Sequence, residues 1–190
     1  MDFLTRVIKI ADEARAAGDH PFGALLVVDD HIVAEAHNLV ITNADITAHS
    51  ETMLVRKLER AGKLDLLRIG TVFASCEPCP MCVGAMFWAG ARHVVFGLSA
   101  KRLTALSIAG GDPFGFTITA GEIGAAATPP MRIDGPHRED EAVLSHEGFW
   151  TSSQLVELRC VDDDDRLVAA DDRLHRFGGD GDPRSSVVAR

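Results

Sequence analysis

Residues 70–90 read GTVFASCEPCPMCVGAMFWAG, an apolar segment followed by closely spaced cysteines and a second apolar segment. The run 70–75 is typical of a buried strand. Pro78 suits the start of a helix, because a proline there loses no hydrogen bond. We therefore expect a strand, a short connection and a helix over 79–89 that carries a cysteine pair in its first turn.

Cys79 and Cys82 lie three residues apart, so both thiols can bind one metal ion from the first helical turn. His49 can add a third ligand from a second helix. Three protein ligands and one water are the usual composition of a catalytic zinc site, whereas a structural site is closed by four ligands. Glu51, two residues past His49, can reach that water without being a ligand. This His-x-Glu and Pro-Cys-x-x-Cys pattern is typical of zinc-dependent deaminases.

Other interpretations of the cysteines stay open at this point. A cysteine pair between a strand and a helix also suits a thioredoxin-like redox motif, although that leaves His49 and Glu51 unexplained. An iron–sulfur cluster would use Cys76 as well, but the ferredoxin spacing requires a fourth cysteine where Met86 stands. The pair can also be inert and buried. We expect Cys76 to be a packed thiol, because a fourth sulfur ligand would close the metal site.

The predicted ligands suit hydrolytic deamination, which needs a nucleophile at neutral pH and a proton carrier. Bound zinc lowers the pKa of its water to about 7. The helix N-terminus favours the thiolate forms of Cys79 and Cys82. We expect Glu51 to take the proton of that water and to pass it to the ring nitrogen and then to the leaving amine.

Hydrophobic periodicity along the chain predicts an α/β layered domain. We expect helices at 3–17, 46–61, 79–89 and 138–146, and strands at 23–28, 31–36, 70–75 and 93–97. Asp45 is the predicted N-cap of the second helix. Strands joined by helical crossovers should run parallel. Residues 104–136 are rich in Gly, Ala, Pro and Thr, so we expect long loops there with a short element near 116–118. Phe149 and Trp150 should pack on the last helix.

Composition indicates one globular domain over 1–157 and an acidic, solvated tail over 158–190. The 190 residues are 46% hydrophobic, which is ordinary for a soluble protein with a core. No apolar run approaches the roughly 20 residues of a membrane span. Residues 1–6 lack the features of a signal peptide, so we expect a cytoplasmic protein. The net charge of −9 argues against a nucleic-acid partner, because Lys and Arg drive phosphate binding.

Several segments together resemble the cytidine deaminase-like superfamily. They are PFGA at 21–24, Asn38, TAHSE at 47–51, SCEPCPMC at 75–82 and GAMFWA at 84–89. The resemblance covers about residues 3–100 and is nearest to nucleobase deaminases of the bacterial guanine deaminase type, with tRNA adenosine deaminases further away. It implies a three-layer α/β/α fold with a mixed sheet of about five strands, and a homodimer whose partner helps to cover each site.

The resemblance also implies a role for each matching residue. His49, Cys79 and Cys82 bind zinc, and Glu51 transfers protons. Asn38 hydrogen-bonds the base, Phe22 stacks on it, and backbone N–H groups near Ala48 and Cys79 polarise its carbonyl. Ser50 and Ile46 stand where the family commonly has alanine and proline.

Two further substrate contacts are predicted. Trp88, six residues past Cys82, can turn its edge toward the site. Guanine deaminases of this type close the site with a C-terminal aromatic residue and an acid, whereas this chain has no tyrosine. We expect residues 110–150 to supply the equivalents, with Asp112 as the acid that contacts the substrate.

These observations predict zinc-dependent hydrolytic deamination of an amino-substituted nucleobase, guanine or a related purine, with release of ammonia. The alternatives are deamination of cytosine, of a nucleoside or of another amino-heterocycle, and deamination of adenosine in tRNA. A further alternative is a zinc-containing binding protein that has lost catalysis.

Overall fold

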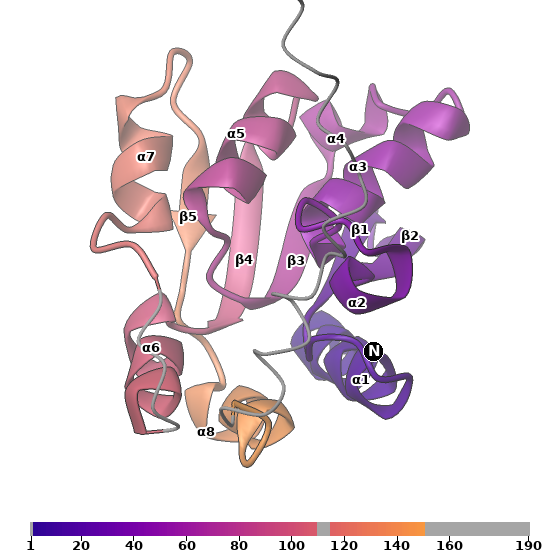
Figure 1. Ribbon diagram of the computed structural model, residues 1–190. Helices are drawn as coiled ribbons and strands as arrows, with labels where there is room; N and C mark the ends of the chain where they lie inside the picture. The colour runs from indigo at the N-terminus through magenta and orange to yellow at the C-terminus, as the bar shows by residue number, and fades with distance from the viewer. Residues whose placement is uncertain (1, 110–114, 151–190) are drawn as a thin grey trace, which may run out of the picture. The chain divides into compact units, whose positions relative to one another are not determined.

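A five-stranded mixed sheet forms the centre of the computed structural model, which describes residues 2–109 and 115–150 (Figure 1). The strand order across the sheet is β2-β1-β3-β4-β5. β1 is antiparallel to both of its neighbours, whereas β3, β4 and β5 are parallel to one another. The strand bounds are β1 Gly23–Val28, β2 His31–His37, β3 Thr71–Cys76, β4 His93–Leu98 and β5 Arg132–Asp134.

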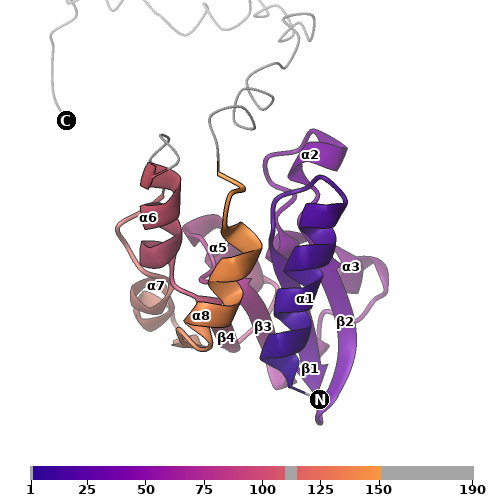
Figure 2. The same cartoon turned by 90° about the horizontal axis from the view of Figure 1, so that it is seen from below.

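Helices cover both faces of the sheet, which gives the predicted three-layer α/β/α fold. Figure 2 shows α1 and α8 on the same side of the sheet. α3 and α5 pack on the other side. The helix bounds are α1 Phe3–Ala16, α2 Val40–Asn43, α3 Ser50–Arg60, α4 Leu66–Ile69, α5 Pro80–Trp88, α6 Ala100–Ala109, α7 Ala120–Ala126, α8 Glu139–Ala142 and a 3-10 turn, η1, at Val143–His146.

β1 is apolar throughout because both of its faces are covered. Leu25 joins Ile10 of α1 in one buried cluster. Its neighbour Leu26 joins Leu54 of α3 and Met86 of α5 in a second cluster. Successive strand residues point to opposite faces, so one strand stabilises both layers. Each leucine that is fully buried in this way contributes about 1.5–3 kcal/mol. The prediction that this strand is buried on both faces is confirmed.

The crossover connections follow the predicted direction. β2 and β3 run the same way, since each is antiparallel to β1, which lies between them. α3 connects these two strands, and α5 connects the parallel pair β3 and β4. Both connections therefore bring a helix start to the same end of the sheet.

The second helix is shorter than predicted. α3 begins at Ser50 because His49 keeps an extended backbone, with φ −67° and ψ 155°. Asp45 was predicted to cap this helix, and that prediction is wrong. Its Oδ1 accepts hydrogen bonds from the Thr47 N–H and hydroxyl, at 2.8 and 2.6 Å, in a turn before the helix. His49 therefore lies at the very start of α3.

Residues 104–136 are more regular than predicted, so the prediction of long loops there is wrong. The segment contains most of α6, all of α7 and β5. α7 begins with a capping box, in which the Thr119 hydroxyl accepts the Glu122 N–H at 3.2 Å and the Glu122 carboxylate accepts the Thr119 N–H at 2.8 Å. Glycine and alanine in this segment hid the helical periodicity. Around 116–118, which the structure describes, no helix or strand forms.

The last predicted helix is confirmed as α8 followed by η1. Phe149 and Trp150 pack with Ala142 and Val143 in a buried cluster, as expected. No helix in the described part of the chain is long and apolar enough to cross a membrane. The predicted tail at 158–190 lies outside the described residues.

Candidate active site

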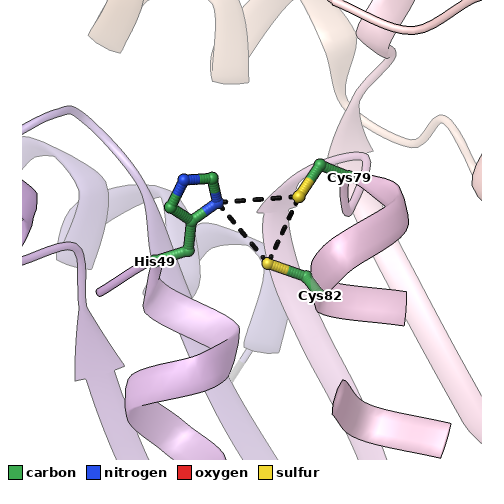
Figure 3. A group of neighbouring side chains, drawn as sticks. All are labelled: His49, Cys79 and Cys82. Carbon is green, nitrogen blue, oxygen red and sulfur yellow. Dashed lines mark hydrogen bonds between the residues drawn. The ribbon is translucent and has the colours of Figure 1, made fainter. Parts of the chain in front are cut away.

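Three potential metal ligands converge between the starts of two helices. His49 precedes α3, Cys79 precedes α5, and Cys82 lies in the first turn of α5. His49 Nδ1 lies 3.5 Å from Cys82 Sγ and 3.7 Å from Cys79 Sγ, and the two sulfurs are 3.6 Å apart. Figure 3 shows the three side chains pointing toward one another.

These separations fit one tetrahedral zinc ion. Bonds of about 2.3 Å to sulfur and 2.0–2.1 Å to nitrogen, at tetrahedral angles, place the ligand atoms roughly 3.5–3.8 Å apart. The observed distances lie in this range without any movement of the side chains. Two thiolates and one imidazole are also the donor types that zinc prefers. The site therefore suits zinc in both geometry and chemistry, and it leaves a fourth position for water.

The environment of the two cysteines favours loss of a thiol proton when a metal binds. The pKa of the Cys79 thiol is lowered to about 4, chiefly by the hydrogen bond with Cys82 and also by the one with His49. The pKa of Cys82 is raised, because it shares that hydrogen bond and because it is buried. Both thiols must be deprotonated to bind a metal, so metal binding releases protons and depends on pH.

Glu51 lies in the first turn of α3 and is only 7% exposed. Burial raises the pKa of its carboxyl above the usual range. The Ser50 hydroxyl donates a hydrogen bond to Oε2 at 2.9 Å, which fixes the orientation of the carboxyl group. A buried, oriented carboxyl beside a metal site is suited to carry protons at neutral pH.

A mostly apolar cavity of about 630 Å³ opens onto these groups. Its lining residues come from the helix starts, from the segment 100–120 and from two aromatic regions distant in sequence. We name three parts of this lining: the metal wall (His49, Glu51 and Cys79), the outer wall (Ala100, Leu103, Thr104, Gly115, Phe116, Ile118 and Ala120) and the aromatic wall (His20, Phe22 and Trp150).

Glu77 connects the metal wall to the outer wall. Its Oε2 accepts the Ala100 N–H at the start of α6, and its Oε1 accepts the Ala120 N–H at the start of α7, both at 2.9 Å. Its own N–H donates to the Leu98 carbonyl at 2.7 Å. The carboxylate thus holds the starts of two helices, where N–H groups lack helical partners. Since Cys79 follows two residues later, one segment positions both walls.

The aromatic wall is held by contacts between the two ends of the described chain. The Trp150 Nε1–H donates to His146 Nδ1 at 3.3 Å, and the two rings stack with an interplanar angle of 11°. Phe22 packs against both rings, with centroid distances of 5.1 Å to His146 and 6.0 Å to Trp150. His20 lies 5.6 Å from the Trp150 ring and 5.9 Å from the Phe149 ring.

The structure brings together only part of the predicted substrate site. Phe22 lines the cavity, and its stacking on a base stays a prediction. Asn38 is 1% exposed, and its Oδ1 accepts the Val40 N–H at 2.9 Å. Its Nδ2 has no hydrogen-bond partner within the described residues, so a buried donor is left for another acceptor. Its role in binding a base stays a prediction.

The other predicted contacts receive less support. Ala48 is fully buried, and its N–H already donates to the Asp45 carbonyl at 2.9 Å, so it is not available to a substrate. Trp88 is 86% exposed at the end of α5 and is not among the residues that line the cavity. Asp112 lies outside the described residues.

His20 and Glu77 were not predicted to belong to the site. His20 and Trp150 reach the cavity only through the fold, since about 130 residues separate them in sequence. Glu77 stands inside the cysteine motif, but no local sequence pattern marks its backbone partners. Trp150 belongs to the segment from which a closing aromatic residue was expected.

Enzymes that deaminate heterocycles with zinc bind the metal with a histidine and two cysteines, and use a glutamate that is not a ligand to move protons. Both parts of this arrangement meet at one cavity here. Together with the family match and the deaminase relatives that follow, this defines a zinc-dependent aminohydrolase. Residues 1–98 match the family model of the cytidine and deoxycytidylate deaminase zinc-binding region. The chain belongs to this family.

Relatives of this chain have several different substrates in their names. A protein named "Probable cytosine deaminase" in Schizosaccharomyces pombe is 39% identical over 149 residues, which are 78% of this chain and 90% of that protein. The tRNA-specific adenosine deaminase of Bacillus subtilis is 37% identical over 95 residues, 50% of this chain and 59% of that protein. The family is therefore established, whereas the substrate is not.

The solved structure of guanine deaminase from Bacillus subtilis is also similar. It is 38% identical to this chain with a TM-score of 0.52, and the match covers 60% of this chain and 73% of that one. This match supports the cytidine deaminase-like fold predicted from sequence.

Proposed function

We propose that this protein hydrolytically deaminates a free amino-substituted nucleobase, guanine or a related purine first among them. The observation that carries the proposal is the mostly apolar cavity of about 630 Å³ that opens onto His49, Glu51 and Cys79. Flat heterocycles bind in apolar cavities with aromatic sides and a few polar groups. Phe22 and Trp150 supply the aromatic sides.

The roles of the residues follow from their positions. His49, Cys79 and Cys82 would hold the zinc, which would supply an activated water by lowering its pKa to about 7. Glu51 accepts a proton from the attacking water and delivers it to the ring nitrogen next to the amine-bearing carbon. A new carbon–oxygen bond forms at that carbon. Glu51 then moves the second proton to the amine, the carbon–nitrogen bond breaks, and ammonia leaves an oxo product.

The choice between purine and pyrimidine rests on two observations. A cavity of about 630 Å³ has room for a bicyclic base such as guanine. Cytosine is the second candidate, since the relative named for it matches 149 residues and therefore extends beyond the zinc-binding region. Other amino-heterocycles and nucleosides are further members of the test panel.

Two alternatives receive weaker support. Relatives include tRNA-specific adenosine deaminases, but the net charge of −9 disfavours a polyanionic substrate. A zinc-containing protein without catalysis would not need a buried carboxyl at Glu51, which is in place. We also propose a cytoplasmic homodimer with a deaminase domain over 1–157, as the sequence predicts.

The test is ammonia release by the zinc-loaded protein from guanine, cytosine, adenine, amino-pterins, amino-triazines and their nucleosides. We expect release from guanine or cytosine that disappears when a chelator removes the zinc and returns when zinc is added. Glu51→Ala protein that has kept its zinc should be inactive. Release from none of the compounds, by a folded protein with full zinc content, would contradict the proposal, and adenosine in tRNA would be tested next.

A further inference from the structure

The polar side chains that line the cavity are mostly committed to other tasks. His49 and Cys79 face the metal position, and Glu51 is assigned to proton transfer. Both oxygens of Glu77 accept backbone N–H groups. Thr104 has an interaction partner of its own.

His20 differs from these groups. It lines the cavity, yet within the described residues its ring nitrogens have no hydrogen-bond partner. Its ring contacts are aromatic: the centres of the Phe149 and Trp150 rings lie 5.9 and 5.6 Å from the centre of the imidazole. A polar ring that is partly buried among aromatic rings and faces a cavity loses hydrogen bonds to water unless a ligand replaces them.

The backbone at His20 is fixed before any ligand arrives. Asp19 is fully buried, and its Oδ1 accepts the N–H groups of Ile41 and Thr42, both at 3.0 Å. On the other side of His20, the Phe22 N–H donates to the His20 carbonyl at 2.7 Å. The imidazole is therefore presented by a rigid segment, and a contact from it costs little conformational entropy.

The imidazole is neutral at physiological pH, because burial lowers its pKa to about 4. A neutral imidazole carries one N–H donor and one bare nitrogen acceptor. In the deamination proposed above, the reacting ring nitrogen and the amine must face Glu51 and the metal position. His20 is thus left to contact other polar atoms of the same substrate.

We propose that His20 is a specificity-determining residue that donates a hydrogen bond to an oxo group of the substrate. The inference deepens the proposed function and rests on it: the substrate class becomes amino-oxo heterocycles, as opposed to heterocycles with amino groups alone. A site built to hydrogen-bond a polar group discriminates strongly against analogues without it, because the site's own polar group is then left unpaired.

Two pairs of compounds isolate the oxo group. Guanine and 2-aminopurine differ by the 6-oxo group with its ring N–H, and cytosine and 4-aminopyrimidine differ by the 2-oxo group with its ring tautomer. Binding of all four would be measured by calorimetry in zinc-loaded Glu51→Gln protein, so that turnover does not interfere. The same measurements would be made with His20→Phe and His20→Gln added, and zinc content would be determined in each protein.

The expected result is a change in the ratio of the two dissociation constants within a pair. With His20 present, the oxo compound binds more tightly than its partner. His20→Phe preserves the aromatic packing and reduces this preference by about 10-fold, while His20→Gln, which keeps a donor, restores part of it. A purely structural role would weaken both members of a pair equally, and that outcome would overturn the inference.

The inference and the proposed function fail in different ways. The unaltered enzyme could release ammonia from an oxo compound while His20→Phe keeps the same binding preference for that compound. This result would contradict the role of His20 and leave the proposed function standing. If the binding preference for the oxo compounds depends on His20 but no compound releases ammonia, the proposed function is contradicted and the role of His20 stands. Absence of both binding and release for all four compounds overturns both.

Discussion

The metal wall and the outer wall of the cavity differ in burial and in how they are held. In the metal wall, Glu51 is 7% exposed, and every member stands at the start of a helix that packs into the core. In the outer wall, Phe116 is 68% and Ile118 is 47% exposed. The outer wall is tied to the rest of the site by the two hydrogen bonds of Glu77.

This difference separates chemistry from substrate choice. The metal wall lies entirely within residues 1–98, which match the family model, whereas the outer wall begins at Ala100. Relatives named for cytosine and for adenosine in tRNA share similarity with this chain. We expect changes in the metal wall to alter the rate of the chemical step, and changes in the outer wall to alter substrate binding.

Glu51→Gln should have the largest effect. Removing the proton carrier lowers kcat by about 10²–10⁴-fold, while KM and zinc content stay nearly constant. Ammonia release under saturating substrate measures this directly. Glu59→Gln, an exposed change on the same helix, is the matched control and should leave kcat unaltered. An equal loss in both proteins would mean that α3, and not its carboxyl, is the sensitive element.

Acid should destabilise the protein through His146, which packs against the aromatic wall. Burial lowers the pKa of His146 to about 3, against an ordinary value of 6.5, so below pH 6.5 the unfolded chain binds a proton that the folded protein does not. Its contribution to stability is complete above pH 6.5 and is lost as the pH falls. Between pH 7 and 5 the free energy of unfolding drops by about 2 kcal/mol for this group.

Urea unfolding at the two pH values measures this loss. His146→Gln should remove about 2 kcal/mol of the acid sensitivity. His137→Gln, at an exposed histidine, should keep the full sensitivity and serves as the control. Identical pH slopes for the two variants would contradict the burial of a neutral imidazole at 146.

Glu77→Gln should raise KM by about 10-fold with little change in kcat. The amide has one oxygen in place of two, so either the Ala100 or the Ala120 N–H loses its acceptor. Steady-state kinetics with measured zinc content tests this. Glu139→Gln is the control: that carboxylate accepts the Ser99 N–H at 3.0 Å beside α6 but does not reach α7. A loss of zinc in Glu77→Gln would show that the residue supports the metal wall instead.

Phe116→Ala should have the smallest effect. An exposed side chain contributes little to stability, so unfolding should change by no more than about 0.5 kcal/mol. We expect the ring of this outer-wall residue to contact the substrate, so KM should rise a few-fold. Ile108→Ala, on the exposed side of α6 and outside the cavity lining, should change neither quantity.

The metal wall was predictable because its signals are local. Cys79 and Cys82 share one helical turn, Glu51 lies two residues past His49, and the apolar strands around them follow a regular pattern. The error at Asp45 concerned where α3 begins, since an Asp side chain can cap a helix or stabilise a turn with the same oxygen.

The outer and aromatic walls were not predictable in the same way. Glu77 meets backbone groups 23 and 43 residues away, and no side-chain pattern marks a backbone partner. His20 and Trp150 meet only after the sheet has formed. Trp88 was assigned by its distance from Cys82 along the helix, but its exposure places it on the solvent side.

The double hydrogen bond of Glu77 has a consequence for motion. α6 and α7 share a single acceptor group, so a displacement of either helix start changes the energy of the other. Movements of the two helix starts should therefore be coupled. Loss of this one carboxylate, which lies two residues from a metal ligand, should speed hydrogen exchange of both the Ala100 and the Ala120 amides.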